Sequence, residues 1–377
     1  MKETAIYIHI PFCDHKCIYC DFYSIISYEN VSSYLLALKK EIEFYSSQYS
    51  TGRKIISIYF GGGTPSFMEP DYISEIISHV KKFFDVKDDA EITIETNPGT
   101  VDKVKLNKFN SAGINRISIG IQSFDNDDLK FLTRIHDSQT AIQTVNDAKE
   151  AGFENISIDL IFNLPGQTKE KWKLNLEQAV NLPIMHISAY SLILEKGTIL
   201  NKMVLDGKIK LQDDDYDAEL YEQTIDFFSQ HGFIQYEVSN FALADSECVH
   251  NNAYWRYKDY LSFGTSAHSF VFGKRWWNYS SLKFYYSSVE EKGNASIGEE
   301  ILSSQQMHNE YVMLALRSKG INTIELKNLF GSDWLKKNNL LLAELKSNNF
   351  IFQNGNLLSL TPKGYSICDE ILTKLKS

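Results

Sequence analysis

Three cysteines crowd into one short stretch near the start of the sequence, at Cys13, Cys17 and Cys20. Their spacing is C-x3-C-x2-C, so a single loop can supply three thiolates. Three thiolates can hold three irons of a cubane [4Fe-4S] cluster, and the fourth iron is then left without a protein ligand. A cluster that only transfers electrons usually takes a fourth cysteine. The spacing therefore predicts a cluster with one open iron, at which an external molecule can bind.

Other interpretations of these cysteines remain open on the residues alone. The chain has five cysteines, and the remaining two, Cys248 and Cys368, stand apart. A disulfide framework would spread its cysteines and would need an oxidising compartment. A zinc ion would need a fourth ligand, and His15 is badly placed between the cysteines. Zinc and ordinary reduced cysteines are the less favoured alternatives.

Glycines and polar residues that could hold a bound molecule follow the apolar runs downstream. Gly62, Gly63 and Thr64 belong to a glycine run that lets backbone approach a ligand, although such a run alone is often only a turn. Asp159 lies inside an apolar run, where an acid is costly without a partner. The other candidates are Glu95, Gln122 and Arg134. The plain alternatives are a helix-capping acid for Glu95 and a solvated surface charge for Arg134.

The elements that must position these residues alternate between two patterns. Short β-branched or aromatic runs predict strands over 6–10, 55–60, 92–96, 117–121, 156–160 and 186–192. Helical periodicity predicts helices over 32–45, 72–84, 102–112, 139–151 and 169–180. This alternation means parallel pairing with right-handed crossovers, and a site at the carboxyl ends of the strands. We expect an α/β fold with an incomplete (βα)6 barrel; a doubly wound open sheet is the alternative.

Two further regions follow the predicted barrel, which covers residues 1–204. Residues 205–300 form an irregular extension, with one helix expected over 215–230 and many Trp and Tyr residues over 254–286. In residues 301–377, helices are expected over 306–318, 323–329, 334–347 and 362–375, with a hairpin around Asn354–Gly355. The last region is therefore predicted to be a small helical, winged-helix-like C-terminal domain.

Together these motifs resemble the oxygen-independent coproporphyrinogen III oxidase-like branch of the radical-SAM superfamily. The pattern runs from Tyr7 to Phe22 and continues over 60–65, 95–98, 120–124 and 159–168. The resemblance implies that S-adenosylmethionine (SAM) binds the open iron, where the reduced cluster cleaves it to a 5′-deoxyadenosyl radical. The implied SAM contacts are Tyr7, Tyr19, Gly62, Gly63, Thr64, Glu95, Gln122, Arg134 and Asp159. In the family, some of these positions serve a second SAM.

The sequence departs from the family pattern at four positions where the family usually has glycine. Two of them, Thr133 and Asn163, follow predicted strands of the barrel. Asn tolerates a left-handed backbone, whereas Thr133 implies a slightly altered loop. The other two, Ser262 and Ser266, bear on the shape of the wall formed by residues 262–268.

Within this branch, coproporphyrinogen III dehydrogenases must be separated from heme chaperones. Dehydrogenases carry a fourth cysteine where this chain has Phe22, and an N-terminal arm, whereas only 12 residues precede Cys13 here. The chaperones carry an H-N-x-x-Y-W motif, which this chain shows from His250 through Tyr254 to Trp255. The resemblance implies that these three residues bind heme, with His as a ligand for iron and the rings as flat apolar surface. The plain alternative for His250 is a structural hydrogen bond.

We therefore predict a heme chaperone without coproporphyrinogen decarboxylation. A dehydrogenase, or another radical-SAM enzyme such as a methyltransferase, is the alternative. Weaker candidates for the heme ligand are Cys248, His9, His136, His186 and His268. The resemblance implies heme-accepting partners such as respiratory cytochromes or oxidases, peripheral contact with membrane proteins, and a monomer or a cluster-dependent dimer.

Net charge and the lengths of the apolar runs indicate what the chain binds and where it is located. The net charge of −10 argues against non-specific binding to nucleic acid, whose phosphates need a basic face. No apolar run approaches the ~20 residues of a membrane span, and no signal peptide is visible. The sequence therefore predicts a cytoplasmic protein.

Overall fold

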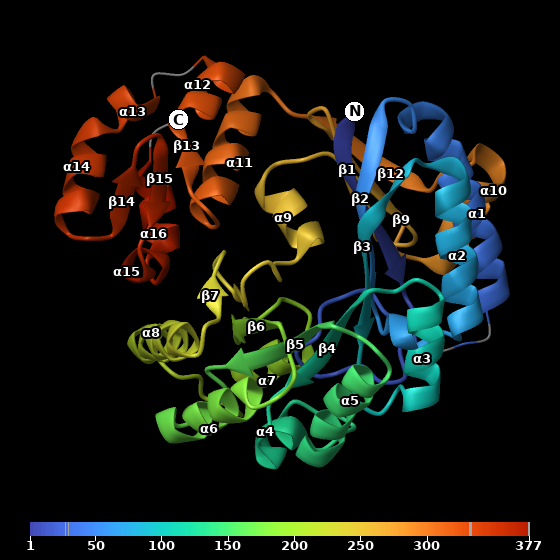
Figure 1. Ribbon diagram of the computed structural model, residues 1–377, viewed down its shortest axis with the longest axis horizontal. Coiled ribbons are helices and arrows are strands. Elements are labelled where there is room, and N and C mark those ends of the chain that lie inside the picture. The colour runs from blue at the N-terminus through green and yellow to red at the C-terminus, as the bar shows by residue number, and fades with distance from the viewer. Residues whose placement is uncertain (27, 29, 332–333, 376–377) are drawn as a thin grey trace.

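A computed structural model of the chain describes residues 1–26, 28, 30–331 and 334–375 (Figure 1). Its main feature is a twelve-stranded sheet in the order β12-β11-β10-β9-β1-β2-β3-β4-β5-β6-β8-β7. The six central strands are parallel: β1 (Lys2–Ile10), β2 (Arg53–Gly62), β3 (Val86–Thr96), β4 (Arg116–Gln122), β5 (Asn155–Phe162) and β6 (His186–Ser191). They pair in sequence order and β6 does not pair with β1, so the predicted incomplete barrel is confirmed.

The crossover helices lie together on the convex face of this curved sheet (Figure 1). They are α1 (Val31–Tyr49), α2 (Pro70–Phe83), α3 (Lys103–Ser111), α5 (Ser138–Glu150) and α6 (Lys169–Val180). All five were predicted, because each is long enough to show an apolar face. The sequence analysis missed η1 (Pro65–Phe67), α4 (Asn126–Phe131) and α7 (Ile199–Leu205). These three segments are too short for helical periodicity to be visible.

The central strands alternate between an apolar outer face and a more polar inner face. On β1, Ile6, Ile8 and Ile10 are fully buried in the main hydrophobic core, whereas Tyr7 and His9 point inward. Successive side chains of a strand point to opposite faces. The same alternation continues on the neighbouring strand, because Tyr7 pairs with Tyr59 of β2 and the two side chains share the inner face. The barrel therefore packs apolar residues against its helices and keeps polar groups in its interior.

Residues 205–300, expected to be irregular, extend this sheet at both edges. Strands β8 (Asn240–Ala242) and β7 (Ile234–Gln235) follow β6, and β9 (Tyr260–Phe263) pairs with β1. Beyond β9 lie β10 (His268–Val271), β11 (Lys274–Asn278) and β12 (Ser296–Ile301). The region also holds α8 (Asp214–Gln230), α9 (Val249–Trp255) and α10 (Leu282–Lys292). Figure 1 shows α9 on the concave side of the sheet, opposite α1 and α2.

The remaining residues form a module with its own hydrophobic core around Trp334 and Leu358. Its helices are α11 (Ser304–Leu316), α12 (Thr323–Phe330), α13 (Trp334–Lys337), α14 (Asn339–Ser347), α15 (Pro362–Tyr365) and α16 (Cys368–Lys374). Its sheet has the order β13 (Ile321–Asn322), β15 (Leu357–Leu360), β14 (Ile351–Asn354), and includes the expected hairpin. The helices predicted over 334–347 and 362–375 are each broken into two. No helix in the described residues is long and apolar enough to cross a membrane.

Glu41 of α1 joins three distant segments in the core. Its carboxylate is fully buried and accepts hydrogen bonds from the Gly264 amide at 2.9 Å, the Asn278 side chain at 2.6 Å and the Tyr285 hydroxyl at 2.7 Å. Burial raises the pKa of Glu41 from 4.5 to about 7, although these hydrogen bonds act in the opposite direction. Between those two pH values the folded chain holds a proton on Glu41 that the unfolded chain releases.

We therefore expect Glu41→Gln to change how stability depends on pH. Glu41 makes the wild type lose stability as the pH rises from about 4.5 to 7, and Gln cannot titrate. The unfolding free energy of the variant, relative to wild type, should rise by up to about 3 kcal/mol between pH 5 and pH 8. Urea unfolding at several pH values measures this. A pH-independent difference for Glu41→Gln would contradict the expectation.

Candidate functional site

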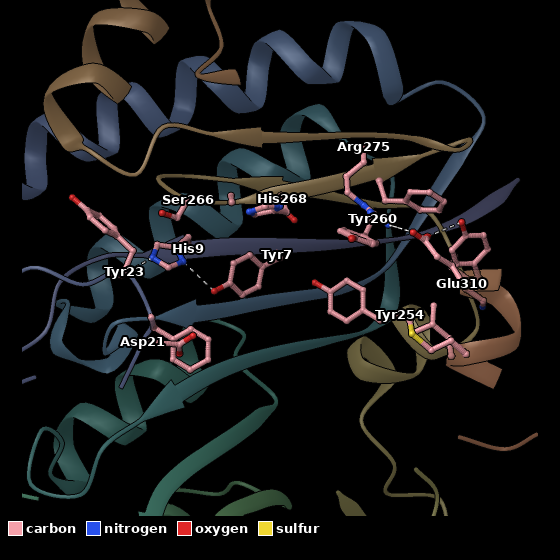
Figure 2. Close-up of a pocket in the computed structure, with 18 residues that line it drawn as sticks. Tyr7, His9, Asp21, Tyr23, Tyr254, Tyr260, Ser266, His268, Arg275 and Glu310 are labelled. Atoms are coloured by element: carbon pink, nitrogen blue, oxygen red, sulfur yellow. Dashed lines mark hydrogen bonds and ion pairs between the residues drawn. The ribbon is translucent and has the colours of Figure 1, made fainter. Parts of the chain in front are cut away.

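Two neighbouring cavities open on the concave side of the sheet. One, of about 410 Å³, is lined by the three clustered cysteines and is called the cysteine cavity below. The other, of about 730 Å³, has five tyrosines and two phenylalanines in its lining and is called the aromatic cavity (Figure 2). Phe22 lines both, and its side chain is 62% exposed. The two cavities therefore share a wall that comes from the loop just after the cysteines.

The cysteine cavity collects nearly all the residues expected to bind SAM. Its lining includes Tyr19, Gly62, Gly63, Thr64, Glu95, Gln122, Arg134 and Asp159, together with Cys13, Cys17 and Cys20. Of the predicted contacts only Tyr7 lies elsewhere, in the aromatic cavity. The sequence analysis missed several other lining residues, including Asn97, Ser118, Tyr190 and Leu192. Strand alternation could have indicated Ser118 and Tyr190, because they share the inner face with Glu95 and Asp159.

The cysteines lie in a loop that is anchored at its start. Cys13 follows β1, and its backbone amide donates a hydrogen bond to the Ile25 carbonyl at 3.0 Å. Its thiol lies 3.1 Å from the Thr64 hydroxyl and donates to the His15 carbonyl at 2.8 Å. Arg134 approaches the Cys17 sulfur, with its Nη1 at 3.6 Å. Burial raises the pKa of the Cys13 and Cys20 thiols.

The three cysteines do not converge on a single point. In the described part of the chain, no three His, Cys, Asp or Glu side chains converge on a point that one metal ion could occupy. A structural zinc ion needs such convergence. The cysteines of an iron–sulfur cluster bind separate irons, so their sulfurs can stay apart. The cluster therefore stays a prediction for these three cysteines, which line one cavity together.

The glycine run packs directly under the cysteine loop. Gly63 donates its amide to Ile10 at 2.8 Å, and a Cβ on it would lie 2.6 Å from the Phe12 carbonyl oxygen. Gly62 has φ 116°, and a Cβ there would meet the His9 ring at 2.7 Å. Both positions therefore require glycine, because β1 and the cysteine loop approach the backbone too closely for a side chain.

Charged groups complete the wall of the cysteine cavity. Glu95 accepts hydrogen bonds from the Tyr59 hydroxyl at 2.9 Å and the Gly62 amide at 3.2 Å, and burial raises its pKa to about 7. Arg134 donates from Nη2 to Asn97 Oδ1 and to the Gly120 carbonyl, both at 2.7 Å. Within the described residues, Arg134 Nε and Thr96 Oγ1 are buried without a partner. Buried polar atoms normally find partners, so these two indicate a polar ligand in the cavity.

The turns after the strands use left-handed backbone at residues other than glycine. Gln122 has φ 73°, Thr133 has φ 56° and Asn163 has φ 61°. The expectation that Asn163 tolerates this geometry is confirmed. Thr133 is β-branched, which makes this conformation uncommon, and its hydroxyl accepts a hydrogen bond from the Ile18 amide at 3.2 Å. Thr133 thus links the turn before Arg134 to the cysteine loop.

The H-N-x-x-Y-W motif forms α9, and the structure turns its histidine away from both cavities. His250 is 1% exposed, and its ring nitrogens lie 3.0 Å from Ser57 Oγ and 2.9 Å from the Tyr254 hydroxyl. Burial lowers the pKa of His250 to about 3, so the ring stays neutral. Tyr254 lines the aromatic cavity, but His250 and Trp255 line neither cavity. In this arrangement His250 makes structural hydrogen bonds, which the sequence left open as the alternative to ligating heme iron.

The aromatic cavity is assembled from segments far apart in the sequence. Its lining combines β1, the loop after the cysteines, α9, β9, β10, β11 and α11. Sequence reasoning noticed the density of Trp and Tyr after residue 254 but missed Tyr257, Lys258, Tyr260, Phe270, Arg275, Glu310 and Met313. Phe270 pairs with Tyr260 on one side and Arg275 on the other, so these three share one face of the sheet. That face continues the inner face of the barrel.

Comparison with known proteins agrees with this fold and site. The radical SAM superfamily model matches residues 7–179, which span the parallel strands β1 to β5. A curated relative from Lactococcus lactis, named heme chaperone HemW, is 32% identical over 99% of this chain and 97% of its own length. HemW of Bacillus subtilis is also 32% identical and covers 97% of both chains. This chain therefore belongs to the HemW heme chaperone family of the radical SAM superfamily.

A solved structure extends the comparison to the whole fold. Coproporphyrinogen III oxidase (HemN) from Escherichia coli, a radical SAM enzyme, superposes with a TM-score of 0.84 at 25% identity. The match covers 99% of this chain and 89% of HemN. The arrangement of barrel, added strands and C-terminal module is therefore shared with HemN.

Proposed function

We propose that this chain is a heme chaperone, which binds heme in the aromatic cavity and passes it to acceptor proteins such as respiratory cytochromes or oxidases. The observation that carries the proposal is a heme-sized aromatic cavity beside the cysteine cavity, in a chain similar from end to end to proteins named HemW. Cavities of about 300–1,000 Å³ are typical of sites for cofactors and small molecules.

The lining of the aromatic cavity suits a porphyrin. A porphyrin is a flat ring system with two apolar faces and two propionates at one edge. The rings of Tyr7, Tyr254 and Tyr260 supply apolar surface with polar tips (Figure 2). Lys258 and Arg275 also line the cavity; each is paired with a carboxylate, Glu3 and Glu310 respectively, and propionates would share these cations with them. The cavity thus offers both kinds of surface that heme presents.

The cysteine cavity is proposed to hold the [4Fe-4S] cluster and SAM. Cys13, Cys17 and Cys20 would bind three irons, and the cluster supplies a one-electron reductant that can cleave SAM. Glu95, Gln122, Arg134 and Asp159 are proposed to bind polar groups of SAM, while the backbone of residues 62–64 allows close approach. Tyr19 packs among Leu132, Ile161 and Leu164, where it can cover an adenine ring.

Coproporphyrinogen III dehydrogenase is the second candidate function, because HemN shares the fold along the whole chain. The wall between the two cavities argues for the chaperone. Phe22 occupies that wall and places an apolar ring where an enzyme of this chemistry would want a reactive group between substrate and cluster. The phenyl ring of Phe22 has neither an exchangeable proton nor a redox-active group that could take part in the oxidation of a substrate radical.

A paired anaerobic assay on the reconstituted protein tests the proposal. One half titrates hemin and follows the Soret band; the other supplies coproporphyrinogen III, SAM and a reductant and looks for protoporphyrinogen. We expect stoichiometric hemin binding and no decarboxylated product. A heme-free acceptor added to the loaded protein should then gain the heme. Protoporphyrinogen formation without stoichiometric hemin binding would identify a dehydrogenase instead.

A further inference from the structure

The chain has nine histidines. They differ in whether they line the aromatic cavity and in whether their ring nitrogens are free to bind heme iron. Only His9 and His268 line the aromatic cavity. His9 is buried, and its nitrogens lie 3.2 Å from the Tyr7 hydroxyl and 3.0 Å from the Tyr23 carbonyl oxygen. His250 is held in the same way by Ser57 and Tyr254. An imidazole whose nitrogens are both engaged must give up a hydrogen bond before it can ligate iron.

His268 differs from both. It is exposed at the start of β10, and neither of its ring nitrogens has a hydrogen-bond partner among the residues that the structure describes. One face of the ring is supported by Trp277, its antiparallel partner on β11, with 6.0 Å between ring centroids and 22° between planes. The imidazole is therefore oriented by stacking while its nitrogens stay free. Burial, and then the charge of Arg275, lower its pKa, which favours the neutral form that binds metals.

The position of His268 within the cavity also suits a ligand. It shares its face of the sheet with Phe270, two residues on, and with Arg275 of the neighbouring strand. Figure 2 shows His268 between Ser266 and Tyr260, on the side of the cavity formed by the added strands. A flat ring held between this side and the tyrosines of β1 and α9 would therefore meet an imidazole, apolar rings and the ion pair of Arg275 with Glu310.

We infer that His268, rather than His250, supplies the nitrogen ligand to heme iron in the aromatic cavity. This inference rests on the proposed function, since it names the ligand within the proposed heme site. It also gives His250 a different role. By bonding the Tyr254 hydroxyl, His250 is a positioning residue for a ring that lines the cavity.

Hemin titration of the full chain, followed by absorption and electron paramagnetic resonance, tests the inference with four variants. His268→Ala should weaken hemin binding by at least about tenfold and remove the imidazole signature, and added imidazole should restore that signature. His268→Cys should replace it with the signature of a thiolate ligand, a readout that loss of packing alone would not produce. His231→Ala, an exposed histidine outside the cavity, should match wild type in affinity and spectrum. His250→Ala should keep the imidazole signature.

The outcomes separate the ligand from the function. If wild type binds hemin but both His268 variants keep its spectrum and affinity, the inference is overturned and the proposed function stands. Loss of the imidazole signature in His250→Ala alone would return the ligand to α9 and equally overturn it. Failure of wild type to bind hemin would overturn the proposed function together with the inference.

Discussion

Replacing Cys17 by alanine should remove most of the iron, and the visible iron–sulfur absorption, from protein reconstituted anaerobically. The cluster has only three protein ligands in this assignment, so losing one leaves two irons of the cubane without a protein ligand. Cys17 is a sharper choice than Cys13. It is partly exposed, whereas Cys13 is 7% exposed and contacts Thr64 and His15. Truncating Cys17 therefore disturbs the packing of the loop less than truncating Cys13 would.

Cys368→Ala is the matched control for this experiment. Cys368 is a buried thiol in the C-terminal module, far from the loop that carries the cluster in sequence and in a separate hydrophobic core. The control should keep wild-type iron content and absorption, even if its stability falls slightly. Iron content and absorption that survive in Cys17→Ala would show that the cluster assignment is wrong. Iron quantitation alongside the spectrum distinguishes a lost cluster from one that is only perturbed.

The parallel core of the fold could be predicted because its signals are local. In the run from Ile6 to Ile10, β-branched isoleucines alternate with aromatic rings, and each crossover helix has enough turns to show one apolar face. The cysteine cavity could be predicted for a related reason. Parallel strands end at the same edge, so polar residues at strand ends, such as Glu95 and Gln122, must converge.

The aromatic cavity could not be predicted, because no local pattern encodes it. Its walls come from β1, α9, β9 to β11 and α11, and the added strands are too short for a periodic signal. The orientation of His250 could not be predicted from the sequence either. The motif gives residue types and spacing, but the direction of the imidazole follows from where α9 docks. That docking depends on Glu91, which lies on β3 and carries no sequence signal of its own.

Replacing Glu91 by alanine should be among the most destabilising single changes in the chain. The Glu91 carboxylate accepts hydrogen bonds from the backbone amides of Val249 and His250, both at 3.0 Å. It also lies 3.8 Å from Nε of Arg116, and both side chains are almost fully buried. Truncation leaves two amides of α9 unsatisfied and an arginine charge without its neighbouring carboxylate. Breaking a buried pair in this way costs about 3–5 kcal/mol of unfolding free energy.

A double variant separates the charge from the hydrogen bonds. Arg116→Met added to Glu91→Ala removes the uncompensated charge, so the double variant should be less destabilised than the two single losses added together. The surface variant Glu154→Ala is the control and should lose no more than about 1 kcal/mol, because its ion pair with Lys149 is exposed. Urea unfolding of the wild type, the two single variants, the double variant and the control at one pH measures these differences. If the single losses simply add, Arg116 and Glu91 do not interact, and the whole loss belongs to the amides that position α9 and, through it, Tyr254 at the aromatic cavity.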